Sequence, residues 1–159
     1  MSSAGIYTAI AAGGFLLILF VVLIAVAWYV VTALGIYKIL NLYGYDKAWL
    51  AWIPYGQYFA LGDVACGGAE VLPMFGKDLP ALLYKLWWIG TFVVSFVPAI
   101  GTWLGIAIRV LFLGTVFTKI FMDTENKTLE DARVIGYISG FIPIVGVIKF
   151  FSITGNSSK

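Results

Sequence analysis

The sequence predicts an all-α integral membrane protein with three transmembrane helices and two short re-entrant or interfacial helical hairpins. Of its 159 residues, 62% are hydrophobic and 11% are charged, whereas a soluble domain is about 45–50% apolar and about 25% charged. Three apolar stretches are interrupted by a proline, which breaks helices. We expect one membrane domain over residues 1–159, and five short transmembrane helices are the alternative.

The first predicted span covers residues 6–37. No charged side chain occurs between Met1 and Tyr37, and about 20 apolar residues are enough to cross the hydrocarbon layer. The stretch is longer than that, so the helix is expected to tilt or to extend beyond the bilayer. No lysine or arginine precedes it, so it is interpreted as a retained helix and not as a signal peptide.

Residues 48–62 form an uncharged segment that is short for a full crossing. Pro54 and Gly56 interrupt it, and its tryptophans and tyrosines are typical of the headgroup level. A re-entrant or interfacial hairpin therefore fits this segment better than a complete span. The glycine-rich stretch 64–77 that follows is not assigned regular structure.

A long apolar stretch from Leu79 to Phe121 predicts a transmembrane hairpin. As one helix it would be about 60 Å long, roughly twice the thickness of the hydrocarbon layer. Pro98 and Gly101 mark the turn, which gives spans at residues 79–97 and 102–120.

Residues 123–133 are polar and are predicted to form a cytoplasmic loop. The apolar segment 134–153 follows, and Pro143 and Gly146 lie in its middle. This segment is interpreted as re-entrant or as a short transmembrane helix.

The positions of the basic residues give an independent prediction of topology. If both short segments turn back inside the membrane, every basic residue except Arg109 lies on one face; these are Lys38, Lys47, Lys77, Lys85, Lys119, Lys127, Arg133, Lys149 and Lys159. The positive-inside rule makes that face cytoplasmic. The expectation is a multi-pass protein of the plasma membrane with its N-terminus outside and its C-terminus in the cytoplasm.

The composition excludes several classes of chemistry. The chain has no histidine and a single cysteine, Cys66, so the commonest general base and metal ligand is missing and no intrachain disulfide can form. The net charge is +2, and no basic stripe indicates nucleic-acid binding. We therefore expect no enzyme activity, cofactor, metal or nucleic-acid partner.

Arg109 is the most suggestive single residue, because a charge in the middle of a transmembrane segment is costly. It could bind an anionic lipid, line a cavity, or pair with an acid such as Asp63, Glu70 or Asp78. The alternatives are a structural ion pair or a side chain that reaches toward the headgroups. Arg109, Asp63 and Glu70 are the candidate intramembrane polar site, although loop solvation also explains the two acids.

Two pairs of glycines have the spacing that lets helices approach closely, Gly101 with Gly105 and Gly136 with Gly140. They are predicted to pack helices within one chain, and contacts between copies are the alternative.

One stretch of the chain carries a family resemblance. Residues 48–54, Ala-Trp-Leu-Ala-Trp-Ile-Pro, preceded by Ile-Tyr-Lys-Ile-Leu at 36–40, resemble small multi-pass membrane proteins of Gram-positive bacteria that have no known function. These proteins repeat I-P-x-x-N/G turns, and the resemblance covers about residues 34–62 and 96–150. Gln57, Gly101 and Gly146 replace the usual asparagine in the three copies. The resemblance implies a bacterial origin and this architecture, and it transfers no site.

Two functional hypotheses follow. The first is a non-enzymatic membrane component that forms homo-oligomers or docks with a larger membrane assembly, of a secretion, conjugation or structural type. The second is a small channel, pore former or carrier in which Arg109 faces a cavity. The bilayer is a partner in both hypotheses, and an anionic lipid at Arg109 is compatible with either.

Overall fold

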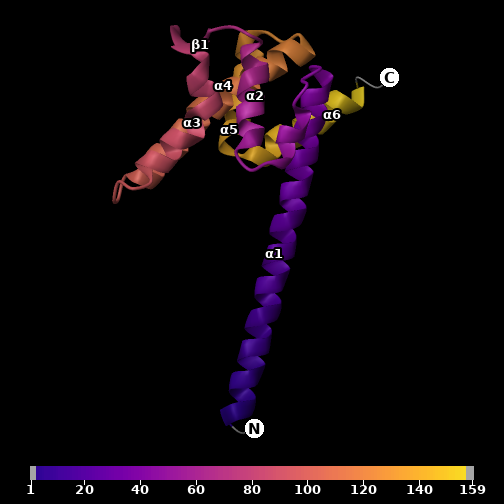
Figure 1. Cartoon of the computed structure of the whole chain (residues 1–159), viewed down its shortest axis with the longest axis vertical. Helices are drawn as coiled ribbons and strands as arrows, with labels where there is room; N and C mark the ends of the chain where they lie inside the picture. Colours follow the sequence, from indigo (N-terminus) through magenta and orange to yellow (C-terminus); the bar gives the residue numbers. More distant parts are fainter. Residues whose placement is uncertain (1–2, 157–159) are drawn as a thin grey trace. The chain divides into compact units, whose positions relative to one another are not determined.

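The computed structural model describes residues 3–156, with side chains described from residue 12, and it is almost entirely helical. Its elements, labelled in Figure 1, are α1 (Ser3–Leu42), η1 (Ala48–Trp52), α2 (Gly56–Cys66), β1 (Val71–Met74), β2 (Lys77–Pro80), α3 (Ala81–Val94), α4 (Gly101–Glu125), α5 (Leu129–Phe141) and α6 (Pro143–Asn156). The predicted helical class is confirmed. The ends of the expected domain, residues 1–2 and 157–159, lie outside the described part.

Two of the described helices are long and apolar enough to cross a membrane, the stretch Ala12–Leu42 of α1 and the whole of α4. They are compatible with a membrane location. The third expected span is the apolar helix α3, which is only 14 residues long.

The chain divides into two compact units, residues 1–32 and residues 33–159. The first unit is the N-terminal part of α1, whose apolar side chains are exposed; Phe15 and Phe20, for example, are 66% and 65% exposed. The second unit has a hydrophobic core that includes the buried side chains of Ile39, Phe121 and Phe150.

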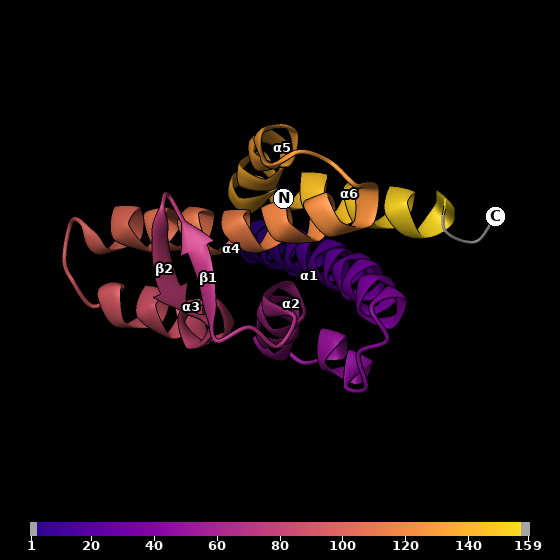
Figure 2. The ribbon, with the colours of Figure 1, turned by 90° about the horizontal axis from the view of Figure 1, so that it is seen from above.

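Within the second unit, α3 and α4 form a helical hairpin, and α5 packs along α4 (Figure 2). Glycines set these close approaches. A Cβ atom at Gly105 would lie 3.0 Å from Thr91 Cγ2 of α3, and one at Gly140 would lie 2.8 Å from the Gly114 nitrogen of α4. Cβ atoms at Gly101 and Gly136 would meet the Val94 carbonyl oxygen and the Thr118 hydroxyl. These four glycines therefore contact helices of their own chain.

The helices are interrupted next to each of the three prolines that were expected to break them, Pro54, Pro98 and Pro143. Tyr55 follows Pro54 with a φ of 66°, and Ala99 follows Pro98 with the same φ. In the third break, Ile142 is extended and Pro143 is the first residue of α6, a position that tolerates its missing N–H.

The glycines near these prolines have different roles. Gly56 and Gly101 begin α2 and α4. Gly146 lies inside α6, where a Cβ atom would come within 2.8 Å of the Phe117 ring. Gly146 therefore allows helix packing instead of forming the break.

The predicted loop over 123–133 is wrong in its bounds, because α4 continues to Glu125 and α5 begins at Leu129. Thr128 caps α5, since its hydroxyl accepts a hydrogen bond from the Asp131 nitrogen at 3.3 Å. The acidic residues Glu130 and Asp131 lie in the first helical turn, where they interact favourably with the helix dipole. The polar residues thus mark helix ends, and only residues 126–128 connect the two helices.

The stretch 64–77, to which no regular structure was assigned, contains the end of α2 and most of a β-hairpin. Strands β1 and β2 are antiparallel, with Leu72 opposite Leu79. Phe75 and Gly76 connect them with φ values of 49° and 80°. Two consecutive positive φ values are typical of the tight turn that matches the twist of paired strands.

Candidate functional site

A pocket of about 550 Å³ surrounds Arg109 between α2, α3 and α4. Its walls are mainly aromatic; the lining residues are Tyr55, Tyr58, Trp87, Trp88, Thr91, Phe92, Ser95 and Arg109. Two pairs of rings in the walls contact each other: the centroids of Tyr55 and Trp88 are 4.9 Å apart, and those of Tyr58 and Trp87 are 5.1 Å apart. The size and apolar lining are typical of small-molecule sites.

Arg109 lies on α4, eight residues after the helix begins at Gly101. Its Nη2 donates a hydrogen bond to the Phe141 carbonyl oxygen at 3.1 Å, at the break between α5 and α6. Its Nε is buried and has no hydrogen-bond partner. The four ion pairs found among the described residues involve lysines, so the described part of the chain provides no carboxylate for Arg109.

The two tryptophans of the pocket also have unpartnered donors. The indole Nε1 atoms of Trp87 and Trp88 are buried and have no hydrogen-bond partner in the described structure. An unmade hydrogen bond of a buried donor costs about 1–3 kcal/mol. Three residues that line one pocket thus carry donors without partners. An acceptor from outside the chain could complete their hydrogen bonds.

A second pocket of about 280 Å³ shares Arg109, Thr91 and Ser95 with the first. The hydroxyl of Thr91 donates to the Trp87 carbonyl oxygen at 3.3 Å, and that of Ser95 donates to the Phe92 carbonyl oxygen at 2.6 Å. Their hydrogens are therefore used within α3, whereas Arg109 and the two indoles have donors without a hydrogen-bond partner.

Asp63 lies in a different cluster from Arg109. Its carboxylate contacts Lys85 Nζ at 2.6 Å and accepts a hydrogen bond from the Tyr45 hydroxyl at 2.8 Å. Gly62 explains why Asp63 pairs with Lys85. It has no Cβ atom, which would otherwise meet the backbone of Tyr84, so α2 and α3 can approach closely. This approach places Asp63 beside Lys85.

The electrostatics of this cluster follow from its contacts. Burial opposes ionisation of Asp63, but the hydrogen bonds from Lys85 and Tyr45 and the charge of Lys85 outweigh it, so the pKa of Asp63 is lowered. Burial and the hydrogen bond to Asp63 raise the pKa of Tyr45 to about 12. Asp63 is thus an ionised structural partner of Lys85.

Glu70 does not join Arg109 either. It is exposed just before β1, and its backbone carbonyl accepts a hydrogen bond from the Ala81 nitrogen at 2.8 Å. The expected polar site of Arg109, Asp63 and Glu70 is therefore divided among three places in the fold. Arg109 alone lines the main pocket.

A second charged cluster joins the end of α4 to α6. Glu125 contacts Lys149 Nζ at 2.6 Å and Lys127 Nζ at 3.2 Å. Like the cluster of Asp63, it connects residues that lie before and after a short apolar segment.

Among residues 3–156, no group of three or more acidic, histidine or cysteine side chains is close enough to hold a metal ion. Cys66 is buried in the core, and its thiol contacts the Ala81 carbonyl oxygen at 4.0 Å. No protein-family model, curated protein or solved structure matches this chain.

The sequence singled out Arg109 and not the residues around it. Tyr55 and Tyr58 belong to the aromatic residues of the segment 48–62, whose composition is typical of the headgroup level and does not place them beside Arg109. One pattern in the sequence does relate three of the lining residues to one another. Trp88, Thr91 and Ser95 recur at helical spacing and thus lie along one face of a predicted span. Their proximity to Arg109 depends on the packing of α3 against α4.

Proposed function

We propose that this chain is a non-enzymatic, multi-pass component of the plasma membrane that associates through α1 with a second copy or with another membrane protein. The length of the uncharged helix carries the proposal. The uncharged part of α1, from Ser3 to Tyr37, has 35 residues, or about 52 Å of helix, whereas the hydrocarbon layer is about 30 Å thick. Even a tilt of about 40° leaves a surplus, and a protein partner would cover it.

The charged clusters support three spans with two re-entrant segments. Tyr45 and Asp63 flank the segment 48–62, and their side chains are 2.8 Å apart. Glu125 and Lys149 flank the segment 134–148 at 2.6 Å. Residues on either side of a segment that crosses about 30 Å of hydrocarbon could not touch in this way. These contacts favour re-entrant hairpins over the five-span alternative.

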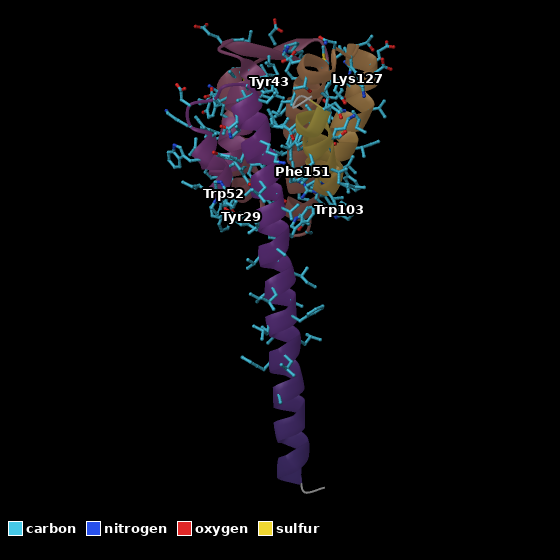
Figure 3. The ribbon with its side chains drawn as sticks, turned by 90° about the vertical axis from the view of Figure 1, so that its right-hand side faces the viewer. Tyr29, Tyr43, Trp52, Trp103, Lys127 and Phe151 are labelled. Atoms are coloured by element: carbon cyan, nitrogen blue, oxygen red, sulfur yellow. The ribbon has the colours of Figure 1, made fainter. Side chains whose placement is uncertain are left out.

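The distribution of side chains within residues 33–159 supports the proposed orientation. In Figure 3, Tyr43 and Lys127 lie at one end of this unit, and Trp52 and Trp103 lie at the other. The first end carries the charged clusters, which fits the cytoplasmic face under the positive-inside rule. The turn after Pro98 would then face the outside.

Disulfide crosslinking in native membranes tests the association through α1. Single cysteines at residues 19–22, in a Cys66→Ala background, are expected to give homodimers or a heavier adduct at one or two positions per turn. Only one face of a packed helix approaches its partner, so the yield should vary with helical periodicity. A cysteine at Phe96, an exposed residue of another helix end, measures the yield of random collisions. Monomers at all four positions would contradict the proposal.

Cysteine labelling from each side of the membrane tests the topology. Cysteines at the exposed positions Asp46 and Ala69 flank the first short segment, and those at Glu130 and Asn156 flank the second. All four are expected to react with an impermeant maleimide from the cytoplasmic side only, and a cysteine at Ile100 from the outside only. Members of a flanking pair that react from opposite sides would establish the five-span alternative instead.

A small carrier is the second candidate, and one observation favours it. Arg109 lines two adjoining pockets instead of pairing with a described acid. The same pocket is the basis of the inference that follows.

A further inference from the structure

The Arg109 pocket offers positive charge and hydrogen-bond donors with little to oppose them. Among the described residues that line it, Arg109 is the one basic residue and none is acidic. Three of the residues that line it, Arg109, Trp87 and Trp88, each carry a buried donor atom without a hydrogen-bond partner in the described structure. The complementary ligand is therefore an anion with several acceptor oxygens.

The surroundings of the pocket favour an amphiphilic ligand over a free ion. Phe92 lines the pocket and is exposed, and Phe96 follows it near the turn with 72% of its surface exposed. Apolar surface of this kind next to the charged site matches the acyl chains that accompany a lipid headgroup.

The depth of Arg109 also fits a headgroup. It lies eight residues from the start of α4, which corresponds to about 12 Å of helix. With the turn at the outer face, the guanidinium is within reach of the outer headgroup region, because arginine side chains extend toward it. A bound phosphate would also neutralise a charge that the described chain leaves without a counter-ion.

We propose that the Arg109 pocket binds the phosphodiester headgroup of an anionic membrane lipid, with Arg109, Trp87 and Trp88 as its hydrogen-bond donors. The inference rests on the proposed membrane location. It does not require association through α1.

Native mass spectrometry of the full chain in mild detergent tests the site. Phosphatidylglycerol and phosphatidylcholine with identical acyl chains serve as probes at equal concentration. Phosphatidylglycerol is expected to be retained preferentially, and Arg109→Gln is expected to weaken its binding about tenfold, as for the loss of a charge-assisted hydrogen bond. Equal retention of the two lipids would overturn the proposal.

Matched variants separate the site from general effects. Trp88→Phe removes one indole donor and keeps an aromatic ring, so a loss of about threefold or more is expected, in line with a neutral hydrogen bond. Trp103→Phe makes the same change outside the pocket, and Arg133→Gln removes an exposed charge elsewhere. Both controls are expected to keep the preference. A loss as large in these controls as in Arg109→Gln would overturn the proposal.

Further variants and competitors keep the test decisive. Arg109→Lys retains the charge without the guanidinium fork and should bind phosphatidylglycerol at an intermediate level, which serves as the readout if Arg109→Gln does not fold. Inorganic phosphate and oleate at equal concentration identify the source of the anion. Displacement by phosphate alone would show a free-anion site, and displacement by oleate a carboxylate site, and each would overturn the assignment to a phospholipid.

The lipid-binding assay gives a result that is independent of the labelling and crosslinking assays. A chain that labels with the proposed topology but shows no preference for phosphatidylglycerol lacks only this lipid site. A chain that prefers phosphatidylglycerol but does not crosslink through α1 lacks only the proposed association.

Discussion

Replacement of Gly136 by alanine is expected to lower the free energy of unfolding of the unit 33–159 by about 2 kcal/mol. The added Cβ atom would collide with the Thr118 hydroxyl and lie 2.7 Å from the Thr118 backbone nitrogen. Because backbone cannot rotate away as a side chain can, α4 and α5 must separate. Such overpacking costs about 3 kcal/mol at the upper end of its usual range, and the better helix propensity of alanine recovers about 1 kcal/mol.

Gly90→Ala provides the matched control. Gly90 is also inside a helix, α3, but a Cβ atom there would lie 3.9 Å from the nearest atoms, in the Ile108 side chain. This variant is expected to be neutral or up to about 1 kcal/mol more stable. Unfolding in mixed micelles, followed by circular dichroism, measures both. Equal stability of the two variants would contradict the proposed role of Gly136 in helix packing.

Gly136 also shows which part of the helix packing can be predicted from the sequence. Its spacing from Gly140 predicts a close helix approach, but the partner surface on α4 is formed by Gly114 and Thr118, which lie about 20 residues earlier in the chain. No local pattern links these positions. The candidate packing residues are therefore visible in the sequence, whereas their partners emerge only from the fold.

Local chemistry explains which elements can be predicted. Proline acts on its own helix, so the breaks next to Pro54, Pro98 and Pro143 follow from the sequence. The stretch 123–133 shows the opposite case, because its polar residues have the composition of a loop. Thr128 instead uses its hydroxyl to begin α5, and an N-cap of this kind resembles a loop by composition alone.

The candidate site also has a part that the sequence predicts and a part that depends on the fold. Arg109 is conspicuous because a charge in an apolar stretch stands out. Its contact with the Phe141 carbonyl and its place beside Trp88 depend on how α3, α4 and the α5–α6 break pack together. Asp63, which was expected to share a polar site with Arg109, instead pairs with Lys85. That contact depends on the close approach of α2 and α3 at Gly62.

Replacement of Tyr84 by alanine is expected to destabilise the unit 33–159 by about 3–4 kcal/mol. The side chain is 0% exposed, and its ring contacts that of Phe112 of α4 with centroids 5.4 Å apart. Truncation of a buried aromatic residue removes these contacts and leaves a cavity, at a cost of about 3–5 kcal/mol. The lower part of that range applies here if lipid replaces water around the unit, because the transfer of apolar groups then contributes less.

Tyr84→Phe isolates the contribution of the hydroxyl group. This group donates a hydrogen bond to the Leu72 carbonyl oxygen at 3.1 Å and so connects α3 to β1. Its loss is expected to cost about 1 kcal/mol, with the ring packing retained. The same micelle unfolding measurement compares the two variants. If Tyr84→Phe cost as much as Tyr84→Ala, the connection to the hairpin, and not the packing of α3 on α4, would dominate the stability of this region.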